Sequence, residues 1–69
     1  MFIVIELQTN SEGQVSSLVY PFENENEAMS KYHAVLSVAA TSALPKHACC
    51  IITDEGFYLK HECFKHPAQ

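Results

Sequence analysis

The chain has 69 residues, of which 48% are hydrophobic and 17% are charged, and this balance excludes an intrinsically disordered protein. Its length allows one domain, which we expect to span residues 1–65, with a frayed tail at 66–69. The formal net charge is −4 and arginine is absent. Because nucleic acids and anionic membranes attract clustered Lys and Arg, the composition argues against both as partners.

The cysteines indicate a reducing environment. There are three, and Cys49 and Cys50 are adjacent, so a complete disulfide framework cannot form. The apolar opening segment is interrupted by Glu6 and has no basic residues before it, which does not fit a secretion signal. We therefore expect reduced thiols and a cytoplasmic location.

The first third of the chain predicts two strands. Residues 2–8 and 15–22 are rich in β-branched and aromatic side chains, and turn-forming residues lie between them at 9–13. Alternation places Leu18, Tyr20 and Phe22 on one face of the second strand. Pro21 lacks an amide hydrogen, so this strand belongs at an edge of the sheet.

A helix is predicted from about Asn24 to Leu44, ahead of Pro45. Asn24 is a suitable N-cap, with Glu27 three residues later. The helix has one broad apolar face, typical of packing against a sheet. That face contains Ala28, Met29, Tyr32, Val35, Leu36, Ala39, Ala40 and Ala43.

The last third predicts a β-hairpin. Residues 48–53 and 57–64 flank Asp54-Glu55-Gly56, which suits a three-residue loop with glycine in the left-handed conformation. If Thr53 lies opposite Phe57, the pairs 51–59, 49–61 and 47–63 follow.

The order ββαββ limits the topology. An all-antiparallel sheet requires strand order 2-1-3-4 or 1-2-4-3, with the helix on one face. We favour 2-1-3-4 because it places the two most apolar strands in the centre. The expected fold class is therefore α+β, with a four-stranded antiparallel sheet and one helix.

The strands carry more apolar surface than one helix can cover. With Ile3, Ile5 and Leu7 facing the helix, the opposite sheet face still holds a large apolar patch, which favours a homodimer or a protein partner. The alternative is a curled sheet with ordinary scattered exposure. The predicted contact surface centres on Phe2, Val4, Val19, Ile52 and Tyr58.

The predicted hairpin register suggests a possible metal site. It places His47 opposite Cys63 and Cys49 opposite His61, a ligand set that zinc accepts. Alternate residues on a flat hairpin spread over a patch, whereas structural zinc sites use a C-x₂₋₄-C knuckle. We therefore favour core-like cysteines, and keep zinc binding through this quartet as the alternative function.

Enzymatic chemistry has little support in the sequence. A small thiol enzyme, with Cys49 paired to His61 or Cys63 to His47, is the less favoured second alternative. Such a pair needs an activated thiolate and an oxyanion site, but the glycines are confined to Gly13 and Gly56. Phosphate-binding, dinucleotide-binding and metalloprotease motifs are absent. We predict no catalytic residues and no cofactor. The expected function is a small, non-enzymatic, self-associating interaction module.

Overall fold

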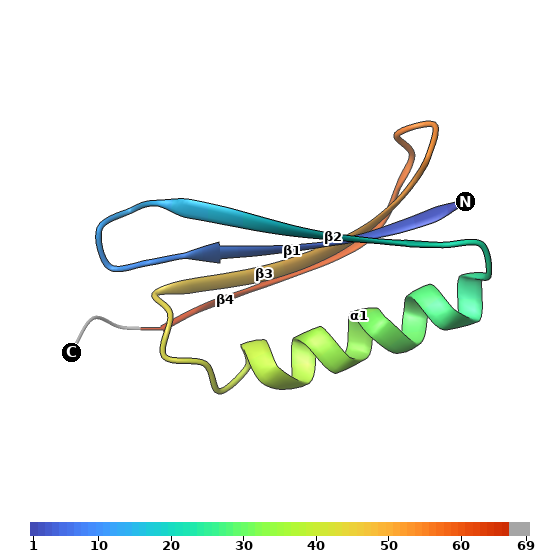
Figure 1. Ribbon diagram of the computed structural model, residues 1–69. Coiled ribbons are helices and arrows are strands. Elements are labelled where there is room, and N and C mark those ends of the chain that lie inside the picture. The colour runs from blue at the N-terminus through green and yellow to red at the C-terminus, as the bar shows by residue number, and fades with distance from the viewer. Residues whose placement is uncertain (67–69) are drawn as a thin grey trace.

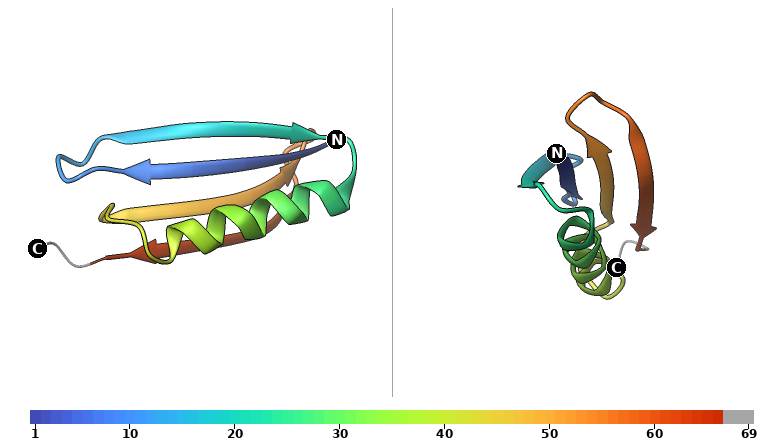
Figure 2. Two further views of the ribbon diagram at one scale, coloured as in Figure 1. Left: turned by 60° about the horizontal axis from the view of Figure 1, so that its bottom comes forward. Right: turned by 90° about the vertical axis from the view of Figure 1, so that its right-hand side faces the viewer.

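The computed structural model describes residues 1–66 as one antiparallel sheet with a helix on one side (Figures 1 and 2). The strand order is β2-β1-β3-β4. The α+β class, the ββαββ order and the favoured strand order 2-1-3-4 are therefore confirmed. Within residues 1–66, no helix is long and apolar enough to cross a membrane. In chain order the elements are β1 (Phe2–Thr9), β2 (Val15–Phe22), α1 (Glu25–Ala39), β3 (Lys46–Thr53) and β4 (Tyr58–Lys65).

Helix α1 begins where the sequence predicts and ends earlier. The Asn24 side chain accepts hydrogen bonds from the amides of Asn26 and Glu27, so it caps the helix as expected. The helix ends at Ala39, not at Leu44. Beyond that point the chain tightens, because the Thr41 amide donates to Val38 O, three residues back. The remaining residues connect the helix to β3.

The core lies between α1 and the two central strands. Side chains from the predicted apolar helix face meet side chains of β1 and β3, and aromatic residues of β1 and β2 close the core at one side. The buried residues of this apolar cluster are Val4, Ala28, Tyr32, Val35, Cys49 and Ile51, and the partly buried Phe2, Tyr20, Phe22, Met29 and Leu36 pack against them.

Strand β1 faces the opposite way from the prediction. Val4 is fully buried and Phe2 packs against the same core, so both lie beneath α1 and not on the open face. The sequence leaves this choice open because β1 is apolar at both odd and even positions. Burial of Glu6 beneath the helix, where His47 bonds it, accompanies the observed orientation. Ile3, Ile5 and Leu7 consequently face away from α1.

The β3–β4 loop forms as predicted, but the register beyond it differs. The Thr53 amide donates to Phe57 O at 2.8 Å, and Gly56 has a φ of 89°, which suits a glycine in the left-handed region. A bulge then shifts the β3–β4 register by one residue: Ile52 pairs with Tyr58, but the next residue, Ile51, pairs with Lys60. The predicted pairs 51–59, 49–61 and 47–63 are wrong. The observed pairs are Ile51 with Lys60, Cys49 with Glu62 and His47 with Phe64.

The predicted tail is anchored at its first residue. His66 donates its backbone amide to Pro45 O at 2.8 Å, and its Nε2 lies 2.9 Å from Ala39 O. His66 therefore contacts both the residue before β3 and the end of α1. Residues 67–69 of the predicted tail lie outside the described residues.

Candidate interaction surface

The sheet face opposite α1, which we call the helix-free face, is not covered by any element of residues 1–66 (Figures 1 and 2). Directly paired residues on neighbouring strands point to the same side of a sheet. The pairing therefore assigns alternate residues of every strand to this face. They are Ile3, Ile5, Leu7 and Thr9 of β1; Val15, Ser17, Val19 and Pro21 of β2; Lys46, Ala48, Cys50 and Ile52 of β3; and Tyr58, His61, Cys63 and Lys65 of β4.

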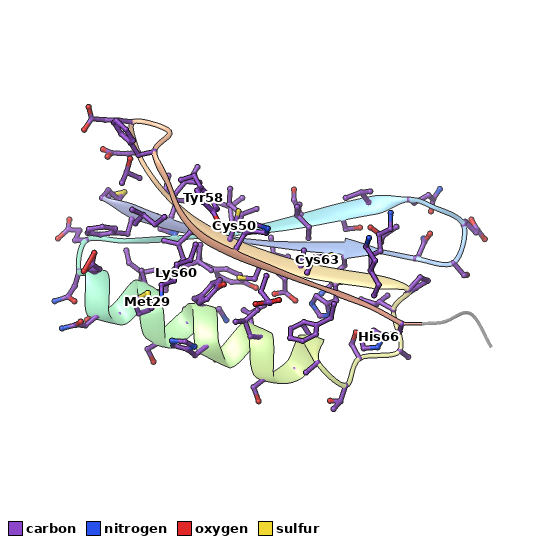
Figure 3. All side chains as sticks on the ribbon, turned by 180° about the vertical axis from the view of Figure 1, so that it is seen from behind. Met29, Cys50, Tyr58, Lys60, Cys63 and His66 are labelled. Atoms are coloured by element: carbon purple, nitrogen blue, oxygen red, sulfur yellow. The ribbon has the colours of Figure 1, made fainter. Side chains whose placement is uncertain are left out.

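Large apolar side chains on this face remain open to solvent. Val19 is 58% exposed and Tyr58 is 57% exposed, and Ile52 lies between them across the sheet. Figure 3 shows Tyr58 and Cys50 on the side of the sheet away from α1, and Lys60 beside Met29 on the helix side. Of the predicted contact residues, Val19, Ile52 and Tyr58 lie on the helix-free face. Phe2 and Val4 do not.

Both edges of the sheet carry features that discourage strand addition. Pro21 removes a backbone donor from the outer strand β2. The outer strand β4 has a bulge near its start and carries Lys60 and Lys65. Bulges and lysines are common means by which edge strands avoid further pairing. The helix-free face is therefore a better surface for association than either edge.

The charge on the helix-free face has one sign. Its formally charged residues are Lys46 and Lys65, which are direct cross-strand partners at one end of the β3–β4 hairpin. Among the residues that the pairing assigns to this face there is no Asp or Glu. Like charges directly opposite each other on a sheet are unfavourable, so this corner is suited to an anionic neighbour.

The His/Cys quartet is divided between the two sides of the sheet. His47 and Cys49 of β3 lie beneath α1, while the bulge in β4 turns His61 and Cys63 to the helix-free face. Four zinc ligands must converge on one ion. Within residues 1–66, no three His, Cys, Asp or Glu side chains are grouped in a way that could hold a metal ion.

The thiols of Cys49, which is buried, and Cys50, which is partly exposed, are poorly suited to nucleophilic chemistry. Burial raises the pKa of Cys49 to about 11, and the neighbouring Cys50 and Glu6 add to the effect. Burial also raises the pKa of Cys50. A catalytic cysteine needs the opposite shift, produced by cationic neighbours or a helix N-terminus. These two side chains therefore act as small apolar residues of the sheet.

A buried hydrogen-bonded contact between Glu6 and His47, beneath α1, was not predicted from the sequence. Glu6 is 8% exposed and His47 is 2% exposed, and His47 Nε2 lies 2.6 Å from Glu6 Oε2. Gln8 Nε2 also donates to Oε2 at 2.9 Å, and the Tyr20 hydroxyl donates to Oε1 at 3.4 Å. Within residues 1–66, the other ring nitrogen of His47, Nδ1, is buried without a hydrogen-bond partner.

These contacts stabilise the ionised form of Glu6. Burial alone would raise its pKa, but the hydrogen bonds from Gln8 and His47, helped by the charge of His47 and the Tyr20 hydroxyl, hold the pKa below its usual value. The pair is enclosed between the sheet and the helix, out of reach of a substrate. The available signal for this contact was the presence of Glu6, Gln8 and His47 in otherwise apolar strands. To bring them together, the β1–β3 register had to be known.

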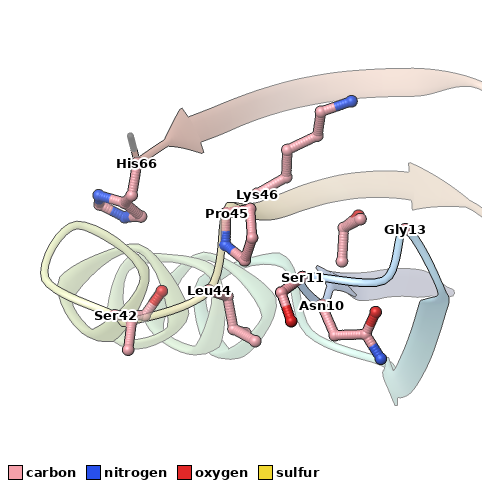
Figure 4. Close-up of a pocket in the computed structure, with 10 residues that line it drawn as sticks. Asn10, Ser11, Gly13, Ser42, Leu44, Pro45, Lys46 and His66 are labelled. Atoms are coloured by element: carbon pink, nitrogen blue, oxygen red, sulfur yellow. The ribbon is translucent and has the colours of Figure 1, made fainter. Parts of the chain in front are cut away.

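A hollow lies at the end of the molecule away from the β3–β4 turn (Figure 1), and Figure 4 shows residues that line it. It has a volume of about 840 Å³ and lies between the β1–β2 turn, the segment after α1 and His66. The Ser42 hydroxyl oxygen is buried there without a partner among residues 1–66. Hydroxyl, amide and aliphatic groups dominate the lining. They come from Thr9, Asn10, Ser11, Gly13, Ser42, Ala43, Leu44, Pro45, Lys46 and His66. This set contains no carboxylate or thiol beside His66.

Comparison with known proteins gives no family for this fold and surface. The chain matches no protein-family model, and neither the curated proteins nor the solved structures yielded a match.

Proposed function

We propose that this protein is a small, non-enzymatic module that associates with itself through the helix-free face. The observation that carries the proposal is the continuous apolar surface formed by Ile3, Ile5, Leu7, Val19, Cys50, Ile52 and Tyr58. Monomeric proteins rarely expose contiguous apolar patches larger than a few hundred Å². A second sheet packed on this one would remove the patch from water.

The size of the face is compatible with a dimer. Four strands of this length cover a flat area of roughly 500 Å² at ordinary strand spacing and rise. Two such faces would bury roughly 1,000 Å² in total, without the extra area that protruding side chains add. A specific interface is expected to reach about this size. Each apolar side chain transferred from water adds favourable free energy in proportion to its buried area.

The orientation of β1 adds to the support. With Ile3, Ile5 and Leu7 turned away from α1 and the carboxylate of Glu6 turned toward it, the apolar side chains of β1 enrich the uncovered face. A strand that served a monomer would be expected to bury its aliphatic side chains and expose its carboxylate. The proposal includes a cytoplasmic location, supported by the free state of Cys49, Cys50 and Cys63.

The proposal is tested by sedimentation equilibrium across a range of protein concentrations. The wild-type chain should pass from monomer to dimer as concentration rises, and Val19→Glu should remain monomeric because it places a charge in the apolar face. Val38→Glu is the matched control, since Val38 is 61% exposed but lies on α1. A wild-type chain that stays monomeric and soluble at high concentration contradicts the proposal.

A further inference from the structure

We infer that the second copy lies face to face with the first in an antiparallel orientation, with Lys65 of each copy beside Glu55 of the other. This inference rests on the proposed self-association and specifies its geometry. Three observations carry it: the lysine pair at one end of the β3–β4 hairpin, the acidic turn at the other end, and the bend of that turn toward the helix-free side.

An anionic neighbour would offset the repulsion between the two paired lysines. Lys46 and Lys65 are direct partners across β3 and β4 on the helix-free face. Their like charges repel in an isolated chain. Within residues 1–66, neither ammonium group forms an ion pair. A carboxylate from a molecule seated on the face would turn this repulsion into attraction.

The carboxylates for this contact lie at the opposite end of the same hairpin. The turn contains Asp54 and Glu55, and the N-terminal amine of Met1 approaches Asp54 Oδ1 at 3.4 Å. Glu55 is exposed and, within residues 1–66, forms no ion pair. Figure 1 shows the turn rising from the sheet on the side opposite α1. A bulged strand bends and twists more strongly, which explains the rise and directs the turn toward a copy on that face.

In a symmetric face-to-face dimer the two-fold axis lies in the plane between the two sheets, and we compare two directions of that axis. If the axis runs across the strands, each hairpin lies over the other with its ends exchanged, and the lysine corner of one copy meets the acidic turn of the other. If the axis runs along the strands, Lys46 of one copy lies near Lys46 of the other. The first arrangement joins opposite charges and the second joins like charges, so the first is favoured.

Charge reversal in two separate chains tests this geometry. Lys65→Glu alone and Glu55→Lys alone should each weaken the dimer about tenfold, because every symmetric dimer contains the contact twice. An equimolar mixture of the two variant chains should recover the wild-type affinity, since both contacts in the mixed dimer again join opposite charges. The measurement is sedimentation equilibrium at low salt, repeated at high salt, where the differences should shrink.

Matched controls are available on the same strand. Lys60→Glu and Glu62→Lys make the same charge changes, but both residues lie on the helix side of β4. They should leave the dimer affinity within about twofold of wild type. Their equimolar mixture should show no preference for a mixed dimer.

The outcomes separate this inference from the proposed function. A dimer that Val19→Glu disrupts, but that the two reversals leave unchanged or strengthen, overturns the antiparallel arrangement and keeps association through the face. A wild-type chain that never dimerises overturns both. Selective formation of the mixed dimer supports both the association and its antiparallel arrangement. Only direct contact between two copies of this chain would let one charge reversal compensate the other.

Discussion

At the scale of single residues, Glu6 explains why β1 faces as it does. A carboxylate in an apolar strand is ordinarily assigned to the solvent side. Here Gln8, Tyr20 and His47 supply hydrogen bonds beneath α1, so the charge is compensated where it is buried. A buried carboxylate that loses its hydrogen-bond partners is left uncompensated, and such a loss is costly.

Replacement of Glu6 by Gln should lower stability and reduce its dependence on pH. The folded-state pKa of Glu6 is lowered from an ordinary value of 4.5, so its contribution is present above that value and is lost as pH falls through the folded pKa. The wild type should exceed Glu6→Gln by about 2 kcal/mol at pH 7. That difference should shrink as the pH is lowered from 5 to about 3.

The measurement is urea unfolding at several pH values and one fixed protein concentration, because association also affects apparent stability. Glu12→Gln is the control, since Glu12 is exposed in the β1–β2 turn. It should leave the unfolding free energy nearly unchanged. An equal difference between wild type and Glu6→Gln at every pH would contradict the role given to the Glu6 carboxylate.

At the scale of elements, the features that depend only on neighbouring residues were predicted correctly from the sequence. The Asn24 cap, the Asp54-Glu55-Gly56 loop and the apolar face of α1 depend on neighbouring residues, and all were identified from the sequence. The end of α1 was predicted too late, because alanines continue past Ala39 as good helix formers. In the structure the Thr41 and Ser42 amides donate to carbonyls three residues back, so the chain leaves the α-helical pattern there.

The bulge in β4 is the element that sequence reasoning could not place. One extra residue in a strand reverses the facing of every side chain beyond it. Nothing in the sequence around Leu59 specifies that extra residue, because apolar and polar side chains alternate acceptably in either register. The bulge also divides the His/Cys quartet. The predicted contact residues Phe2 and Val4 lie beneath α1 for a separate reason, since β1 is apolar at odd and even positions alike and its facing could not be chosen from the sequence.

Because the bulge divides the quartet, chelators should not destabilise the protein. His47 and Cys49 lie on the opposite side of the sheet from His61 and Cys63, so one ion cannot take all four ligands. The melting temperature should be the same with excess EDTA as with added zinc. A structural zinc site would lose most of its folding free energy on removal of the metal. A large fall in EDTA that zinc reverses would contradict the division of the quartet.

At the scale of the whole molecule, one helix against four strands leaves half of the sheet surface without cover. Small domains bury a modest fraction of their surface and commonly gain stability from association. The chain places its apolar residues on both faces of β1 and β3, a pattern typical of strands buried on both sides. This pattern is the one that the proposed association through the helix-free face would require.

The cysteines offer a test of the proposed association from within the sheet. Cys50 and Cys63 lie on the helix-free face, whereas Cys49 lies beneath α1. Pulsed alkylation with iodoacetamide, read by mass spectrometry, should slow at Cys50 and Cys63 as protein concentration rises from about 1 μM to about 1 mM, the range over which dimers of moderate affinity form. Cys49 should react slowly throughout, since burial holds its pKa near 11. Val19→Glu should remove the concentration dependence. If sedimentation detects a dimer while Cys50 and Cys63 react at constant rates, the copies meet through a surface other than the helix-free face.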